Sequence, residues 1–427
     1  MKTGFYGWKL LFVFWLILAV NLAFPFYGAS VINTYMAEDF KLDRQLLGLI
    51  FTIFMLTSGV SSPLAAMVIN RIGVRYTMVI GSILVLVSAL CMALLVNSGL
   101  QAVVFFGVIS GLGVVAGGAL PAQTGVNFWF DKRRALALSI VLSAPGFGGF
   151  FAAPILNRII AQADGDWRVG WWLIAGLSLI SIIVAALFIR ENPAAMGQYP
   201  DGLSLDEQQQ AATEAIAADR LKVYRTREEW RFAEAIKTPV LWLVMFCTMS
   251  YGSTFAVFLA HGVIHLQDLG HSPAAAARAL SAMTISTLVG NFIAGALADR
   301  IEPRYLLVTM LCCSFLAMLL LPGVTGAFEM YPATILLGIG FGGSVVCVMT
   351  LLSNYFGLKV YAYVAGCTMA AQIIGSSTMP VLAGTVYDHY GSYANVFHSL
   401  AGFCVCGAVL LLFVRAPLRP QVSELQV

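Results

Sequence analysis

The feature that most constrains this sequence is a series of apolar stretches, each long enough to cross a lipid bilayer. A membrane-spanning helix needs roughly 20 mostly apolar residues, and stretches of that length recur along all 427 residues. Only 11% of the residues are charged, whereas a soluble protein carries about 25%. The sequence therefore predicts an all-α membrane protein with twelve spans. We expect these spans at 9–34, 46–69, 76–96, 101–127, 135–162, 168–190, 239–265, 274–298, 304–324, 328–352, 361–386 and 392–415.

The basic residues indicate how the spans are oriented. Lys and Arg stay on the cytoplasmic side of a membrane, and with the N-terminus inside, 19 of the 24 basic residues lie there. An even number of spans also places the C-terminus in the cytoplasm, so we expect a multi-pass protein of the cell (inner) membrane. We expect two halves of six spans, 1–190 and 239–417, with a cytoplasmic linker at 191–238 that contains amphipathic helices and a tail at 418–427.

Motifs of catalysis and of cofactor binding are lacking in the sequence. The eight cysteines lie inside apolar runs without metal-ligand spacing, which is typical of small apolar fillers. The Gly-x-Gly patterns lie within apolar stretches and are weak signals for a phosphate-binding loop. We therefore expect no enzyme, no cofactor, no metal and no nucleic-acid partner. The first apolar stretch is longer than a signal-peptide core and is expected to remain as a helix.

An internal repeat relates the two halves of the chain. Both halves begin on the same side of the membrane, so the repeat is parallel, an arrangement found in transporters. Three matched pairs carry the repeat, at offsets of 224, 227 and 229 residues: Tyr27-Gly28 with Tyr251-Gly252, Asn127-Phe128 with Asn354-Tyr355, and Asn70-Arg71 with Asp299-Arg300.

The loops that follow the second and eighth spans resemble the signature of the major facilitator superfamily, Gly-x-Leu-Ala-Asp-Arg-x-Gly-Arg-Arg. The second copy runs from Gly295 to Arg304 and departs from the signature at Glu302, and the first copy has Ala66 and Asn70 for Gly and Asp. The resemblance implies twelve helices arranged as two pseudo-symmetric six-helix bundles. It also implies a conformational latch at these loops, made here by Asn70, Arg71, Gly73, Arg75, Asp299, Arg300 and Arg304. Alternatively, the arginines only fix the topology.

Further motifs resemble the branch of monocarboxylate porters and oxalate–formate antiporters, whose members carry small carboxylates. These motifs are the opening Phe5-Tyr6-Gly7-Trp8, the stretch from Asn127 to Ser139, the stretch from Arg190 to Gly202, and His261 nine residues before Gly270.

The fold implied by the resemblance lines a central cavity with the first, fourth, seventh and tenth spans. Glycine allows close approach of a ligand, and tyrosine offers an aromatic face and a hydroxyl. The substrate-binding candidates are Tyr27, Gln123, Tyr251, Ser286, Asn291, Gln372 and Ser376. The amides can instead join helices to one another, at roughly 1 kcal/mol each.

Charged residues are missing well inside the predicted spans, which limits the chemistry of the cavity. Carriers of the branch typically have an arginine where this chain has Asn291, and the oxalate-exchanging members have a lysine in the span that holds Gln372. The cavity is therefore expected to be polar, aromatic and uncharged. His261 is the candidate for proton coupling, because histidine titrates near neutral pH; the alternative is an interfacial histidine.

We therefore expect a secondary active or facilitative transporter of a small organic solute, of the monocarboxylate type, that works by alternating access. Symport with a proton is one option for its coupling, and a monomer in the lipid bilayer is the expected state. A carrier of a neutral or aromatic solute is an alternative that fits the uncharged cavity. A non-transporting membrane sensor on the same scaffold is a second alternative, although such proteins add long soluble segments.

The orientation can be tested at Ser204, which lies in the predicted cytoplasmic linker. A cysteine placed there should react with a membrane-impermeant thiol reagent in inverted vesicles but not in intact cells, with the parent protein as the control for its native cysteines. Reaction from outside intact cells would overturn the topology.

Overall fold

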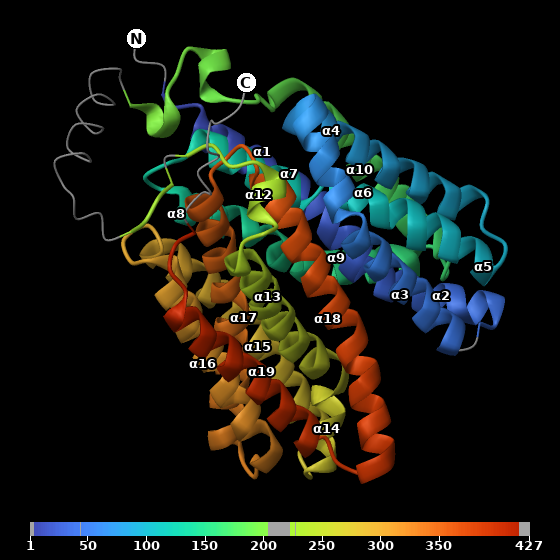
Figure 1. Cartoon of the computed structure of the whole chain (residues 1–427). Helices are drawn as coiled ribbons and strands as arrows, with labels where there is room; N and C mark the ends of the chain where they lie inside the picture. The colour runs from blue at the N-terminus through green and yellow to red at the C-terminus, as the bar shows by residue number, and fades with distance from the viewer. Residues whose placement is uncertain (1–3, 43, 204–222, 227, 418–427) are drawn as a thin grey trace.

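The computed structural model describes residues 4–42, 44–203, 223–226 and 228–417 of the chain (Figure 1). Ser204, the rest of residues 204–222 and residue 227 of the predicted linker, and the predicted tail lie outside these ranges. The described residues form helices and connecting loops without any strand. The all-helical prediction is therefore confirmed.

The helices of the first half are followed by short linker helices. The first half contains α1 (Gly7–Leu18), η1 (Ala19–Gly28), α2 (Ala29–Phe40), α3 (Arg44–Val60), α4 (Ser62–Leu94), α5 (Gly99–Ala102), η2 (Val103–Ser110), α6 (Gly111–Ala116), α7 (Ala119–Trp129), α8 (Arg134–Leu142), α9 (Ala144–Gln162) and α10 (Arg168–Phe188). The linker contains η3 (Pro193–Met196), η4 (Pro200–Gly202) and α12 (Phe232–Ala235).

The helices of the second half repeat this plan with fewer interruptions. They are α13 (Pro239–Val257), η5 (Phe258–Gly262), α14 (Val263–Asp268), α15 (Pro273–Leu297), α16 (Pro303–Leu320), η6 (Leu321–Gly323), α17 (Ala327–Phe356), α18 (Tyr361–Tyr390) and α19 (Ala394–Phe413).

Ten helices among the described residues are long and apolar enough to cross a membrane. Two more segments complete the twelve expected spans. One is the shorter apolar helix Leu46–Val60, which continues into the start of α4. The other is α18, whose 30 residues include Gln372 and Ser376. The structure divides the span expected at 46–69 at Ser61, which lies between α3 and α4.

Gly73 separates two spans within α4. Its φ of +86° lies in the left-handed region, which favours glycine. A Cβ at this position would also lie 2.6 Å from the carboxyl carbon of Glu191. The Glu191 carboxylate accepts hydrogen bonds from the backbone N–H groups of Val74 (2.8 Å) and Arg75 (2.9 Å). Glycine is therefore required for the carboxylate to cap the helix that begins here.

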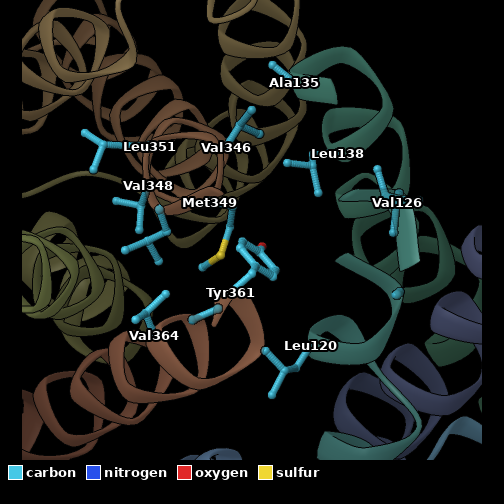
Figure 2. Close-up of a cluster of buried hydrophobic side chains, with 14 of the residues drawn as sticks. Leu120, Val126, Ala135, Leu138, Val346, Val348, Met349, Leu351, Tyr361 and Val364 are labelled. Carbon is cyan, nitrogen blue, oxygen red and sulfur yellow. The ribbon is translucent and has the colours of Figure 1, made fainter. Parts of the chain in front are cut away.

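The two halves share a hydrophobic core at one end of the molecule only. We call this the basic end, because it carries Arg71, Arg75, Lys132, Arg133 and Arg300. Its core joins residues of α7 and α8 to residues of α17 and α18 (Figure 2). Toward the opposite end, the buried residues of each half form a separate cluster, one within 29–175 and one within 257–401.

Small residues allow the halves to approach closely at the basic end. A Cβ on Gly295 of α15 would overlap the Ser139 side chain of α8 and lie 3.0 Å from the Ala135 carbonyl oxygen. A Cβ on Gly366 of α18 would lie 3.0 Å from the Ser62 carbonyl oxygen of α4. Close backbone approach of this kind is the usual basis of helix association in membranes.

The close contact at Gly295 predicts that a larger residue there opens the basic end. Gly295→Val should lengthen the distance between spin labels placed at Arg133 and Ile301 in a cysteine-free background, measured by pulsed electron paramagnetic resonance. Gly176→Val is the matched control, because a Cβ on Gly176 meets no atom within 4 Å. An unchanged distance in Gly295→Val would contradict this account of the contact.

Candidate functional site

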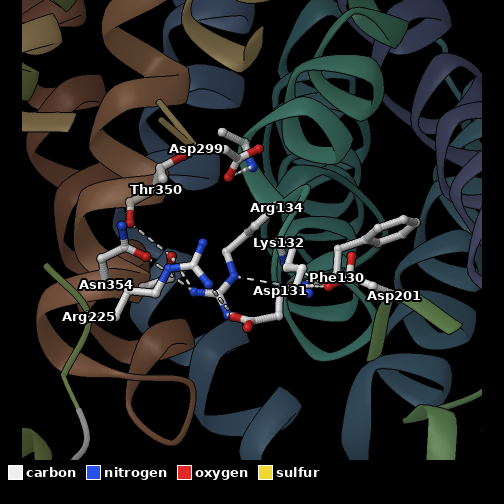
Figure 3. A network of polar contacts seen from close by, with 11 residues as sticks. Phe130, Asp131, Lys132, Arg134, Asp201, Arg225, Asp299, Thr350 and Asn354 are labelled. Carbon is white, nitrogen blue, oxygen red and sulfur yellow. Dashed lines mark hydrogen bonds and ion pairs between the residues drawn. The ribbon is translucent and has the colours of Figure 1, made fainter. Parts of the chain in front are cut away.

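Asp299 joins the two halves at the basic end (Figure 3). It follows α15, and its carboxylate accepts hydrogen bonds from the backbone N–H groups of Ala135 (3.0 Å) and Leu136 (3.3 Å). These two amides lie in the first turn of α8, which belongs to the other half. A carboxylate stabilises a helix N-terminus by about 0.3–1 kcal/mol when exposed and by more when partly buried. Separating the halves would break these two hydrogen bonds and would also return the carboxylate to water.

The surroundings of Asp299 make this carboxyl group titrate near neutral pH. Burial raises its pKa to about 6, because the charged form is poorly solvated there. The two backbone hydrogen bonds and the nearby guanidinium groups of Arg225 and Arg134 lower the pKa, but they offset only part of the effect of burial.

Asn70, which corresponds to Asp299 in the repeat, makes no such contact. Its amide nitrogen donates to the Ala66 carbonyl oxygen in its own helix (2.8 Å). A cavity of about 320 Å³ lies beside it, lined by residues of both halves. Its wall includes Leu358, Lys359 and Ala362 at the start of α18. The repeat is therefore asymmetric at the loops expected to form the latch.

The arginines of the two loops divide into symmetric pairs. The Arg75 guanidinium donates to the Ala186 carbonyl oxygen at the end of α10, and that of Arg304 donates to Val414 at the end of α19. Each therefore holds the last span of its own half. Arg71 and Arg300, the second pair, are exposed.

Glu302, the departure from the signature, holds the linker. Its carboxylate accepts from the Tyr224 backbone N–H and from the Tyr355 hydroxyl, both at 2.8 Å.

Gln372 and Ser376, two substrate candidates of the second half, lie side by side, whereas Tyr251 packs elsewhere. A Cβ on Gly252 of α13 would lie 2.8 Å from Cγ of Gln372 and 2.9 Å from Oγ of Ser376, both on α18. Gln372 and Ser376 are partly exposed. Tyr251 is fully buried against Phe341 (ring centroids 5.7 Å). Thr248 is near its hydroxyl without completing a regular hydrogen bond.

The remaining candidates lie in other places. Tyr27 is 37% exposed and packs against Gly149 of α9. Ser286 is buried against Gly338 of α17 and donates to the Ala282 carbonyl oxygen, which is a packing position. Asn291 is 5% exposed and shares a face of α15 with Gly295, so it points toward the first half. The candidates therefore do not form one compact site in this conformation.

His261 links three helices near the opposite end. Its Nε2 lies 2.9 Å from the Pro380 carbonyl oxygen, and its Nδ1 lies 3.1 Å from the Tyr393 hydroxyl. A carbonyl oxygen only accepts, so Nε2 carries a proton and Nδ1 of the neutral ring accepts from Tyr393. Among the described residues, no group of three or more His, Cys, Asp or Glu is placed to hold a metal ion.

Gln123, the last candidate, belongs to a buried polar cluster that the sequence did not predict. The Tyr361 hydroxyl donates to its Oε1 across the halves (3.4 Å). Asn127, Arg134 and Asn354 are buried in the same region. The sequence suggested a loop position for Arg134, yet its side chain is only 7% exposed. The repeated pair Asn127 and Asn354 could have indicated this cluster, because two amides at matching positions near the ends of apolar helices need polar partners if they are buried.

Comparison with known proteins identifies the scaffold. The family model of the Major Facilitator Superfamily matches residues 11–265 and 241–426. Monocarboxylate transporter 12 of Xenopus laevis is 26% identical over 391 residues, covering 89% of this chain and 81% of the relative. Monocarboxylate transporter 12 of Homo sapiens is 25% identical over 417 residues, covering 92% and 77%.

Solved structures give the same fold. The human organic anion transporter MFSD10 (TETRAN) superposes with a TM-score of 0.68 at 15% identity, covering 95% of this chain and 99% of that one. FucP in the outward conformation gives a TM-score of 0.67 at 15% identity, covering 95% and 97%. The predicted fold class and the resemblance to the monocarboxylate branch are confirmed.

The pKa of Asp299 predicts that acid favours the closed basic end. Protons bind preferentially to the form with the higher pKa, which is the closed form at about 6, while water around an open loop returns the pKa toward 3.8. Lowering the pH from 7 to 5 should decrease the open-to-closed ratio about tenfold, measured with spin labels at Arg133 and Ile301. Asp299→Asn should insert and fold, lose this pH response, and slow the transport cycle. An equal pH response in Asp299→Asn would refute the assignment.

Proposed function

Because this chain belongs to the Major Facilitator Superfamily, we propose that it carries a small organic acid of the monocarboxylate type across the membrane by alternating access. The observation that supports this most is the core shared by the two halves at one end only. Two bodies that meet at one end can rock about a site between them. The same carrier would then close the opposite end when the basic end opens.

The orientation we propose places the basic end in the cytoplasm. The bias of Lys and Arg toward this end supports it. With both termini inside, the conformation described here faces the outside. The chain would work as a monomer, because the candidate residues of both halves belong to one chain.

In this proposal the loops at the basic end form the latch, and the two loops contribute to it unequally. Asp299 bridges the halves in the closed form through the N-terminus of α8, most favourably when its carboxyl group is protonated. Asn70 contributes little, because its amide bonds within its own helix. Arg75 and Arg304 keep each half rigid, and Gly73 permits the turn.

The substrate class rests on the relatives and on the neutral groups near the middle of the helices. Tyr27, Gln372 and Ser376 are at least partly exposed, so they are the residues we propose to touch the solute first. An unpaired carboxylate in a poorly solvated site costs several kcal/mol. The acid would therefore travel with a proton, either its own or one held by the protein. His261 is placed for this, because a proton on Nδ1 would reverse its hydrogen bond with Tyr393.

Uptake into proteoliposomes tests the proposed function. Radiolabelled L-lactate, pyruvate and benzoate should enter faster with the protein than without it, and an imposed membrane potential should not change the initial rates. Empty liposomes and the variant Gly295→Val, in which the basic end is expected to be held open, serve as controls. Uptake of neutral amides but of none of these acids would favour the neutral-solute alternative. Uptake of the anion driven by the membrane potential would contradict the proposal that the acid travels with a proton.

A further inference from the structure

We propose that Gln123, Asn127, Arg134, Asn354 and Tyr361 bind the carboxylate of the solute when the basic end opens. We call these five residues the gate cluster. The inference deepens the proposed function and rests on it, because it assigns partners to the ionised acid group. It also provides a fixed cation on the transport route, although the middle of the helices offers only neutral groups.

The gate cluster is assembled from four helices that belong to both halves. Gln123 and Asn127 are four residues apart on α7 and so share one face of that helix. Arg134 is the first residue of α8, Asn354 lies near the end of α17, and Tyr361 is the first residue of α18. The Tyr361 hydroxyl, which lies 3.4 Å from Oε1 of Gln123, also has Asn127 and Arg134 beside it.

The closed form leaves donors of the cluster without partners. Nε2 of Gln123, Nδ2 of Asn127 and Nδ2 of Asn354 are all buried and make no hydrogen bond, and these side chains are at most 2% exposed. Oδ1 of Asn127 and Oγ1 of Thr350 are buried and unpaired as well. Buried polar groups are normally satisfied, so these groups are expected to find their partners in another conformation.

Arg134 indicates that the missing partner is an anion. Its Nε donates to the Phe130 carbonyl oxygen (3.2 Å), and its Nη2 pairs with Asp131 (3.0 Å), both in its own half. Its Nη1 instead reaches across to Ser353 (3.4 Å) and Asn354 (3.3 Å). Separating the halves removes only these last two acceptors. The freed Nη1 then lies with the unpaired amide donors of α7, an arrangement suited to a carboxylate.

The neighbouring carboxylates do not occupy this position. Asp131 also pairs with Arg225 (2.8 Å), so one carboxylate serves two guanidinium groups. Asp299 is held by the backbone amides of Ala135 and Leu136. Asp201, the third carboxylate near Arg134, accepts from the backbone N–H groups of Asp131 (3.0 Å) and Lys132 (2.6 Å). No carboxylate of the described residues therefore pairs with Nη1 of Arg134, which is left for an arriving anion when the halves separate (Figure 3).

The test compares an acid with its own amide, because the amide keeps the size and shape of the acid but carries no charge. In proteoliposomes oriented with the basic end outward, L-lactate and L-lactamide compete against labelled L-lactate, and the ratio of their inhibition constants gives the preference for the acid. Arg134→Gln should reduce this preference at least tenfold. Arg133→Gln, the matched control, changes the adjacent exposed arginine and should leave the preference within twofold.

The outcomes separate the inference from the proposed function. A loss of gating alone would lower uptake without changing the preference, so an unchanged ratio in Arg134→Gln overturns the inference. An equal loss in Arg133→Gln overturns it too. If the wild-type protein transports no acid, the proposed function itself fails and the inference with it. Should Arg134→Gln fail to fold, Arg134→Lys serves in its place, because it keeps the positive charge but loses the forked N–H donors of the guanidinium group. The preference for the acid should then fall at least threefold, and an unchanged preference would refute the site.

Discussion

The apolar contact between the two halves at the basic end is the interaction on which the rest of this conformation depends. Lipid tails are as apolar as the helix surfaces, so burial alone does not hold membrane helices together. Close packing does, and Gly295 and Gly366 permit it by leaving no Cβ between facing helices. Toward the opposite end the cores separate. The contact between the halves is therefore confined to the basic end.

The polar contacts across this interface are unequal in the two repeats. Asp299 caps a helix of the other half, whereas Asn70 bonds within its own helix beside a cavity of about 320 Å³. The linker adds a further tie between the halves: Arg225 pairs with Asp131, while the Thr226 N–H donates to the Asn354 carbonyl oxygen (2.7 Å). The closed form is thus held on the Asp299 side and by the linker, so opening can begin beside Asn70.

The sequence predicted the helices well, because span length and the repeat depend on local pattern and on basic loops. It also placed Gly73 and Asp299 in the loops that follow the second and eighth spans. It could not tell which face of an apolar helix meets which neighbour. Ser286 was therefore grouped with the substrate candidates although it packs on Gly338. Arg134 was assigned to a loop, because only tertiary structure shows that the other half covers it.

The position of Arg134 also reconciles an uncharged middle with the acidic solute that we propose. A lone cation at mid-membrane is costly and must stay paired in every state. At the end of a span, Arg134 keeps Asp131 and the Phe130 carbonyl oxygen in its own half whether or not the halves meet. Only its Nη1 changes partner. In the transport cycle that we propose, a charge placed there would meet the ionised acid on one side of the membrane, while the neutral groups near Tyr27 and Gln372 would meet it together with a proton.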